Sequence, residues 1–276
     1  NSGGNINGGL MSQLELTSGT FNLYMQGAQS FRYSFTGANA TNGSSPSSGY
    51  SVLPPSSPDS PITAEAFYRH GGKPLTTIES GVTINAVGNN TGSALNSIFY
   101  LGNNTTDPSS ESKLINKATV NLYGNKIAEA NIDNVTSAGS ITFENKGNII
   151  GHATRGEYKD ATNGNKIGDG NSNIGNFIFG AFSYGDRGID TIENGIGGVV
   201  KFYAPESVGW VYSSTNSTEA VQRRSINNGT MELYGANSIG VVTDGDATTV
   251  QTAYMDVQLN NPINILGDQS VGVSIQ

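Results

Sequence analysis

Apolar and polar positions alternate in three related phrases near the end of the chain. The phrases are VKFYAPESVGWV (200–211), MELYGANSIGVV (231–242) and INILGDQSVGVS (263–274). They begin at residues 200, 231 and 263, so the steps are 31 and 32 residues. In each copy the first and third residues are apolar and the residue between them is polar. Alternation with period 2 is typical of a strand with one buried face, so each phrase predicts a strand at its start.

A second short strand ends each phrase, and a glycine stands inside it at the same position in every copy: Gly209, Gly240 and Gly272. A glycine within a strand often marks a bend or the close approach of another backbone. Stacked coils would need that approach at every level. Trp210 stands where the other two copies have valine, so it is predicted to lie in the core.

Turn residues precede each first strand, at Gly197-Gly198, Asn228-Gly229 and Asn260-Asn261-Pro262. Because glycine and asparagine tolerate the left-handed conformation, we expect these corners to adopt it.

The repeat decides the fold class. No single unit can bury its apolar face alone, so neighbouring units must stack. The sequence therefore predicts an all-β fold, a right-handed parallel β-helix (solenoid) with loop insertions and an interior column of aliphatic and aromatic side chains. We expect one β-helical fragment over 1–276, with its most regular repeats in 195–276. Weaker copies occur at 19–35, 118–132 and 140–151.

Three polar segments interrupt the pattern and are predicted to be insertions. Residues 38–62 are rich in serine and proline, residues 152–175 are rich in glycine and asparagine, and residues 213–224 form a shorter polar excursion. Insertions in solenoids map to loops on one flank and often carry binding.

Composition narrows the function. The net charge is −8 and the pI about 4.7, which argues against nucleic-acid binding through phosphate contacts. There is no cysteine, so disulfides and thiolate metal sites are unavailable. The first residues do not resemble a signal peptide, and the chain stops inside a repeat. We therefore expect a piece excised from a longer protein.

Enzyme motifs are few. The two histidines, His70 and His152, both lie next to predicted loops, and no G-x-S-x-G nucleophile elbow is present. A Ser-His-Asp triad is not excluded by the sequence alone. β-Helical polysaccharide lyases and hydrolases need clustered charged residues on one outer face. The densest group here is Asp186, Arg187, Asp190 and Glu193, which we interpret as a solvated loop.

Metal and cofactor motifs are also weak. Asp169 and the pair Asp244 and Asp246 place oxygen atoms in predicted turns, where Asp commonly bonds its own backbone. No metal and no cofactor is expected.

Aromatic residues supply the remaining binding candidates. Tyr203 and Tyr234 occupy equivalent positions and are predicted to stack, although exposed tyrosines can also contact sugars or a partner protein. Beside the proline-rich insertion, a mixed aromatic and basic stretch is the predicted ligand-contact site. Its residues are Tyr68, Arg69, His70 and Lys73.

The phrases INNGTMELYGANSIGVV, INILGDQSVGV and ITFENKGNIIG resemble the passenger domains of large fusobacterial autotransporter adhesins of the RadD type. The resemblance covers residues 195–276 and 116–151, and it is poor over 1–110. It implies a type V secretion passenger at the bacterial cell surface, anchored in the outer membrane only through a C-terminal β-barrel that this sequence lacks. It also implies adhesion to a glycan or protein on host cells or other bacteria.

These observations favour a non-enzymatic adhesin segment whose inserted loops bind a partner while the solenoid acts as a rigid spacer. One alternative is a β-helical carbohydrate-active enzyme, which a cleft with paired carboxylates would favour. Another is a structural stalk with no partner of its own. Deleting 38–62 and 152–175 without loss of adhesion would favour that stalk.

Overall fold

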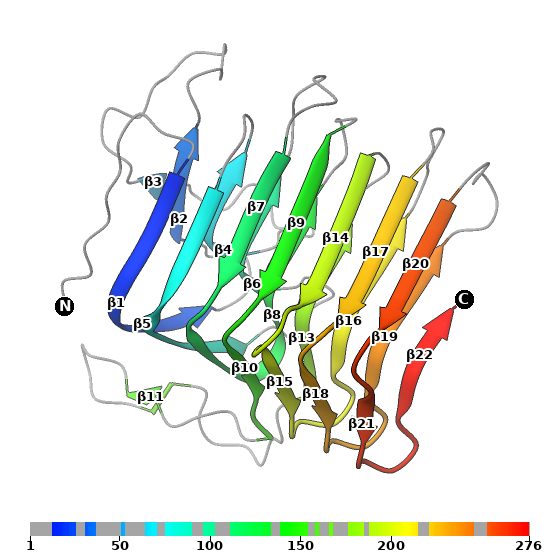
Figure 1. The fold of residues 1–276 in the computed structure, drawn as a ribbon. Helices are drawn as coiled ribbons and strands as arrows, with labels where there is room; N and C mark the ends of the chain where they lie inside the picture. The colour runs from blue at the N-terminus through cyan, green and yellow to red at the C-terminus, as the bar shows by residue number, and fades with distance from the viewer. Residues whose placement is uncertain are drawn as a thin grey trace.

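In the computed structural model, every regular element among the described residues is a β-strand. The described residues are 13–25, 31–36, 51–52, 64–70, 75–89, 96–102, 111–133, 139–153, 158–159, 166–167, 176–184, 188–214, 221–245 and 253–275. The strands coil into a solenoid with three walls, here named A, B and C (Figure 1). This confirms the predicted all-β, parallel, β-helix-like architecture.

Each wall stacks one strand, or part of a long strand, from every coil. Wall A contains the first part of β1 (Gln13–Met25) and of β5 (Leu75–Asn89), then β7 (Glu111–Asn116), β9 (Ser140–Asn145), β14 (Gly188–Asn194), β17 (Val221–Asn227) and β20 (Ala253–Leu259). Wall B contains the later part of β1 and β5, the first part of β8 (Thr119–Asp133), then β10 (Asn148–Gly151), β15 (Val199–Phe202), β18 (Thr230–Leu233) and β21 (Ile263–Ile265). Wall C contains β2 (Phe31–Thr36), β4 (Ala64–His70), β6 (Asn96–Gly102), the second part of β8, β13 (Asn176–Tyr184), β16 (Val208–Ser214), β19 (Ile239–Gly245) and β22 (Val271–Ile275).

All pairings within the walls are parallel. Two short antiparallel pairs lie outside this scheme: β2 with β3 (Ser51–Val52), and β11 (Tyr158–Lys159) with β12 (Lys166–Ile167). The three phrases stack in register, with Val200 opposite Met231 and Met231 opposite Ile263. The predicted 31- and 32-residue repeat is therefore one turn of the solenoid.

The core is the column of side chains that the three walls enclose. Strands of wall A alternate between buried and partly exposed positions, as period 2 predicts. Trp210 is fully buried and meets Phe143 edge to face, with ring centroids 6.0 Å apart. The prediction that Trp210 lies in the core is confirmed.

The recurrent glycines of wall C are required by close approach. A β-carbon on Gly209 would overlap the carbonyl oxygen of Gly240 and lie 3.1 Å from the Met231 side chain, which belongs to the core. Gly240 stands in the same relation to Gly272. Both glycines thus face the interior where adjacent coils touch, which confirms the predicted close approach.

The prediction of left-handed backbone at the turn residues before each first strand was mostly wrong. Of the residues named for that role, only Gly197 has a positive φ, of 85°. Gly198 and Gly229 are needed instead because a β-carbon there would overlap a carbonyl of the preceding coil. The left-handed residues that recur are non-glycine and lie at the corner between walls B and C: Glu206, Asn237 and Gln269, with φ of 55–56°.

A ladder of buried asparagines marks the corner between walls A and B. Asn116 donates to Asn145 (3.0 Å), Asn145 to Asn194 (2.9 Å), and Asn194 to Asn227 (2.9 Å). The amide of Asn227 then donates to the carbonyl of Asn261 at 2.8 Å. Each buried amide is therefore bonded to the coil above or below it, as buried polar groups require.

The predicted insertions fall on connections between strands. Residues 185–187, 215–220 and 246–252 each join a strand of wall C to a strand of wall A. The predicted insertion 152–175 falls between β10 of wall B and β13 of wall C, whereas 38–62 falls between β2 and β4, which both belong to wall C. Most of 38–62 and 152–175 lies outside the described residues. The predicted excursion at 213–224 is shorter than expected, because β16 continues to Ser214 and β17 begins at Val221.

Among the described residues, no helix is long and apolar enough to cross a membrane.

Candidate functional site

The predicted contact site at Tyr68, Arg69, His70 and Lys73 falls largely outside the described residues. The backbone of Tyr68, Arg69 and His70 belongs to β4, which pairs with β6 in wall C. Their side chains and the whole of Lys73 are not described. This site therefore stays a prediction.

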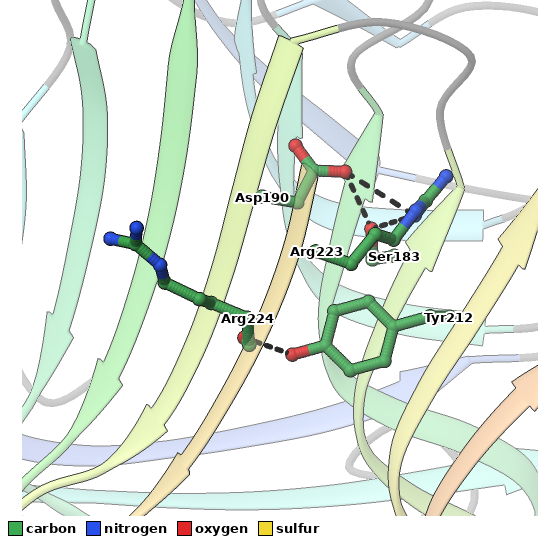
Figure 2. Close-up of polar contacts among 5 residues, drawn as sticks. All are labelled: Ser183, Asp190, Tyr212, Arg223 and Arg224. Atoms are coloured by element: carbon green, nitrogen blue, oxygen red, sulfur yellow. Dashed lines mark hydrogen bonds and ion pairs between the residues drawn. The ribbon is translucent and has the colours of Figure 1, made fainter. Parts of the chain in front are cut away.

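A buried polar cluster lies inside the solenoid, between the ends of walls C and A (Figure 2). The hydroxyl of Ser183 donates to Asp190 Oδ2 at 2.7 Å, and Arg223 Nη1 donates to Ser183 Oγ at 2.8 Å. Arg223 Nη1 lies 3.4 Å from the same carboxylate oxygen. The Arg223 guanidinium carbon is 6.0 Å from the centre of the Tyr212 ring, and the Tyr212 hydroxyl donates to the carbonyl of Arg224.

Asp190 was interpreted from the sequence as part of a solvated loop, and that was wrong. It lies in β14 with 0% of its surface exposed, and its partner Arg223 in β17 is 5% exposed. The two residues are directly opposite in neighbouring coils. Glu193, from the same predicted loop, is also in β14 and accepts a hydrogen bond from Asn228 at 2.9 Å. Asp186 and Arg187 lie outside the described residues.

Alternation along β17 explains why one of two consecutive arginines is buried. Arg223 points into the interior, while Arg224 extends to the other side of the strand (Figure 2). Nearly half of the Arg224 side chain is exposed, and its Nε lies 3.9 Å from Asp256 Oδ2. The sequence did contain a signal for this. Arg223 and buried Asn227 are four positions apart, and residues an even number of positions apart in a strand face the same side.

The chemistry of this cluster is that of a closed ion pair. Burial, followed by the nearby charge of Asp190, raises the pKa of Tyr212 far above its ordinary value, so the phenol stays neutral. Asp190, Ser183 and Tyr212 are at most 2% exposed, so an external substrate has no direct access to them. A buried pair of this kind fixes the register of two coils more readily than it adds net stability.

A second buried acid, Glu129 in β8, has no such partner. It is 0% exposed, and neither carboxylate oxygen has a hydrogen-bond partner among the described residues. Burial raises the pKa of Glu129 well above its ordinary value. Its neighbours in register are Ile98 below and Gly180 above, since Ala128 and Ala130 pair with the residues that flank each of them. Glu129 therefore occupies the position that is glycine in β13, β16, β19 and β22.

His152 lies at the corner that ends wall B, stacked on Tyr123 with ring centroids 4.3 Å apart and planes at 7°. Its Nε2 is 3.0 Å from Asn121 Oδ1, and burial lowers the pKa of the imidazole. Among the described residues, the side-chain partners of His152 are an aromatic ring and an amide, and no Ser-His-Asp arrangement is found within that part of the chain.

In the next two coils along the same corner, Tyr203 and Tyr234 stack with centroids 4.7 Å apart and planes at 18°. The predicted stacking is confirmed. The two tyrosines are 42% and 39% exposed, although the preceding residues Phe202 and Leu233 are fully buried. Beside them, Lys201 Nζ is 2.8 Å from Glu232 Oε2, which also accepts the Tyr234 hydroxyl at 3.0 Å. We name Lys201, Tyr203, Glu232 and Tyr234 the corner stripe.

No group of His, Asp and Glu among the described residues could hold a metal ion. Asp244 was placed in a turn from the sequence, but its backbone belongs to strand β19. Asp169 and Asp246 lie outside the part of the chain that the structure describes.

No family model matches the chain, and no curated protein or solved structure is significantly similar to it.

Proposed function

We propose that this chain is a segment of a cell-surface adhesin, a right-handed parallel β-helix that displays binding surfaces and acts without turnover. The observation that carries the proposal is the repeated phrase. Its three copies stack in register in walls B and C. They are also the part of the chain that resembles the autotransporter passengers. Right-handed connection is the expected hand for parallel strands joined by crossovers.

The stacking supports a display role because every coil contacts only its neighbours. Such a stack can be extended by adding coils without redesigning a core. Of its two long predicted insertions, 152–175 falls between β10 of wall B and β13 of wall C, and 38–62 falls between β2 and β4 of wall C. Loops grafted on a stiff scaffold are a common way to present a binding surface.

The test uses beads coated with the purified chain and mixed with host epithelial cells or other bacteria. Beads coated with a monomeric β-solenoid of another sequence serve as the control. We expect saturable adhesion that soluble chain competes away, and reduced adhesion when 38–62 and 152–175 are replaced by short Gly-Ser linkers. The triple variant Tyr68→Ala, Arg69→Ala, His70→Ala tests the predicted contact site in the same assay.

Adhesion no greater than that of the control beads would contradict the adhesin proposal. Release of reducing ends from a bound polysaccharide would replace it with the carbohydrate-active enzyme. Adhesion unchanged by both loop replacements would place the contact surface on the solenoid itself.

A further inference from the structure

The corner stripe presents aromatic rings and charged groups on an outer edge of the solenoid, where wall B ends. Phe202 and Leu233 point inward and are fully buried, so the residues next to them, Tyr203 and Tyr234, point outward. The next coil carries Leu266 at the same position, 59% exposed. Apolar and aromatic surface therefore recurs once per coil along this edge.

The stacking geometry fixes which part of each ring a ligand can meet. Rings 4.7 Å apart and 18° from parallel cover each other's facing sides. What they leave to solvent is their edges and their hydroxyl groups. Parallel strands in neighbouring coils are about 4.8 Å apart, so the two hydroxyls come from adjacent coils.

Charge in the corner stripe is balanced. The single cation, Lys201, is paired with the single anion, Glu232, at 2.8 Å. The hydrogen bond and charge of Lys201 lower the pKa of Glu232, so both groups stay ionised and compensated at neutral pH. The turns next to the stripe add Glu206 and Asp268 but no lysine or arginine. A polyanion would therefore meet no unpaired cation here.

Sugar hydroxyls match this chemistry. A phenolic hydroxyl both donates and accepts, and the carboxylate and ammonium add an acceptor and a donor on the same line. The ring edges carry partial positive charge and can meet the oxygen atoms of a sugar. An extended β-linked sugar chain also advances by about one coil spacing per residue, so two successive sugars can meet Tyr203 and Tyr234 in two successive coils.

We infer that the corner stripe binds a neutral, extended, β-linked polysaccharide that lies parallel to the solenoid axis. This inference rests on the proposed adhesin function, for which it names the surface and the ligand class. The ligand contacts Tyr203 and Tyr234 through ring edges and hydroxyls, and the Lys201–Glu232 pair orders its hydroxyl groups.

The experiment measures binding of soluble oligosaccharides to the purified chain by calorimetry. The probes are neutral β-linked gluco- and manno-oligosaccharides, oligogalacturonate as the acidic probe, and chitosan oligomers as the cationic probe. The double variant Tyr203→Ala, Tyr234→Ala removes the rings, and Tyr203→Phe, Tyr234→Phe removes only the hydroxyls. Gln222→Ala, at an exposed position of wall A, is the matched control.

We expect the parent chain to bind a neutral probe, with affinity increasing with probe length. The alanine pair should lose about tenfold or more in affinity, since two aromatic contacts of ordinary strength contribute that much. The phenylalanine pair should fall between the alanine pair and the parent, and Gln222→Ala should match the parent. Thermal unfolding of each variant checks that the fold is kept.

Three results would overturn the inference: no neutral probe binds, a charged probe binds better than every neutral one, or the alanine pair binds as the parent does. If bead adhesion persists in any of these cases, the adhesin proposal survives and the contact is a protein or lies elsewhere. Neutral probe binding that the alanine pair loses, without bead adhesion, would instead keep the inference and remove the adhesin proposal.

Discussion

The asparagine ladder and the interior of β8 handle buried polar groups in opposite ways. At the corner of walls A and B, asparagines repeat in four successive coils, from Asn116 to Asn227, and each bonds the next. In β8, Glu129 lies between Ile98 and Gly180, and its carboxylate has no hydrogen-bond partner among the described residues. In a solenoid, a polar group is inexpensive to bury when its neighbours above and below are also polar.

The Asp190–Arg223 pair stands between these two cases. It occupies only two coils, yet each charge finds its partner directly opposite. The three features therefore differ in whether a neighbouring coil provides a hydrogen-bonding or charged partner. Each feature can be tested by removing or replacing one group.

The largest effect is expected from Arg223→Met, which leaves Asp190 buried without its counter-charge. Loss of one partner of a buried pair typically costs about 3–5 kcal/mol of unfolding free energy. Urea unfolding followed by circular dichroism gives the value. Arg224→Met is the matched control, since that side chain is about half exposed, and it should change stability by less than about 0.5 kcal/mol. Equal effects of the two changes would show that the buried pair is not needed.

The next largest effect is expected from Asn194→Ala, in the middle of the ladder. It removes the acceptor of Asn145 and the donor to Asn227 and to the carbonyl of Thr230. Leaving buried amides unsatisfied costs about 1–3 kcal/mol each. Hydrogen exchange of the β14, β17 and β18 amides should report faster local opening. Asn264→Ala, at an exposed position, serves as control, and equal exchange in both variants would count against the ladder.

Glu129→Gln should stabilise the protein at neutral pH and change little in acid. Because burial raises the pKa of Glu129 above its ordinary 4.5, the folded chain keeps a proton that the unfolded chain releases. Stability is then complete below about pH 4.5 and decreases as pH rises toward the folded-state pKa, by about 1.4 kcal/mol per unit. The variant lacks this decrease. Parallel pH profiles of urea unfolding for parent and variant would refute a buried neutral carboxyl.

The smallest effect is expected from Lys201→Met on the outer surface. The melting temperature should change by less than thermal unfolding resolves, because water replaces the lost partner at a partly exposed site. The pKa of Glu232, which the hydrogen bond from Lys201 lowers, should return toward its ordinary value. Carboxyl chemical shifts measured against pH give this directly. A large drop in melting temperature would mean that the corner stripe holds the coils together.

Much of the regular region could be predicted from the sequence. The alternation around Val200, Met231 and Ile263 gave the strands, and their equal spacing gave the coil. The glycines at 209 and 240 indicated close approach, and the equivalence of Tyr203 and Tyr234 indicated stacking. All of these are local or strictly periodic signals, so they do not require knowledge of which coils are neighbours.

The buried charges could not be predicted in the same way. Asp190 and Arg223 are 33 residues apart and become partners only once the register of β14 and β17 is known. Glu129 lies in a less regular copy, where no recurrent phrase showed that its column is otherwise glycine. The left-handed positions of Glu206 and Gln269 were missed because propensity favours glycine and asparagine, and the one asparagine at this corner, Asn237, has no counterpart in the other two copies.

The parallel register also has a mechanical meaning. The hydrogen bonds of all three walls run along the solenoid axis, from each coil to the next. If the two ends were pulled apart along that axis, the hydrogen bonds between any two neighbouring coils would share the force among the three walls. Every boundary between coils would carry the same total force. Under tension the molecule would part first at its weakest boundary, while the other coils kept their shape and could close again when the load was released.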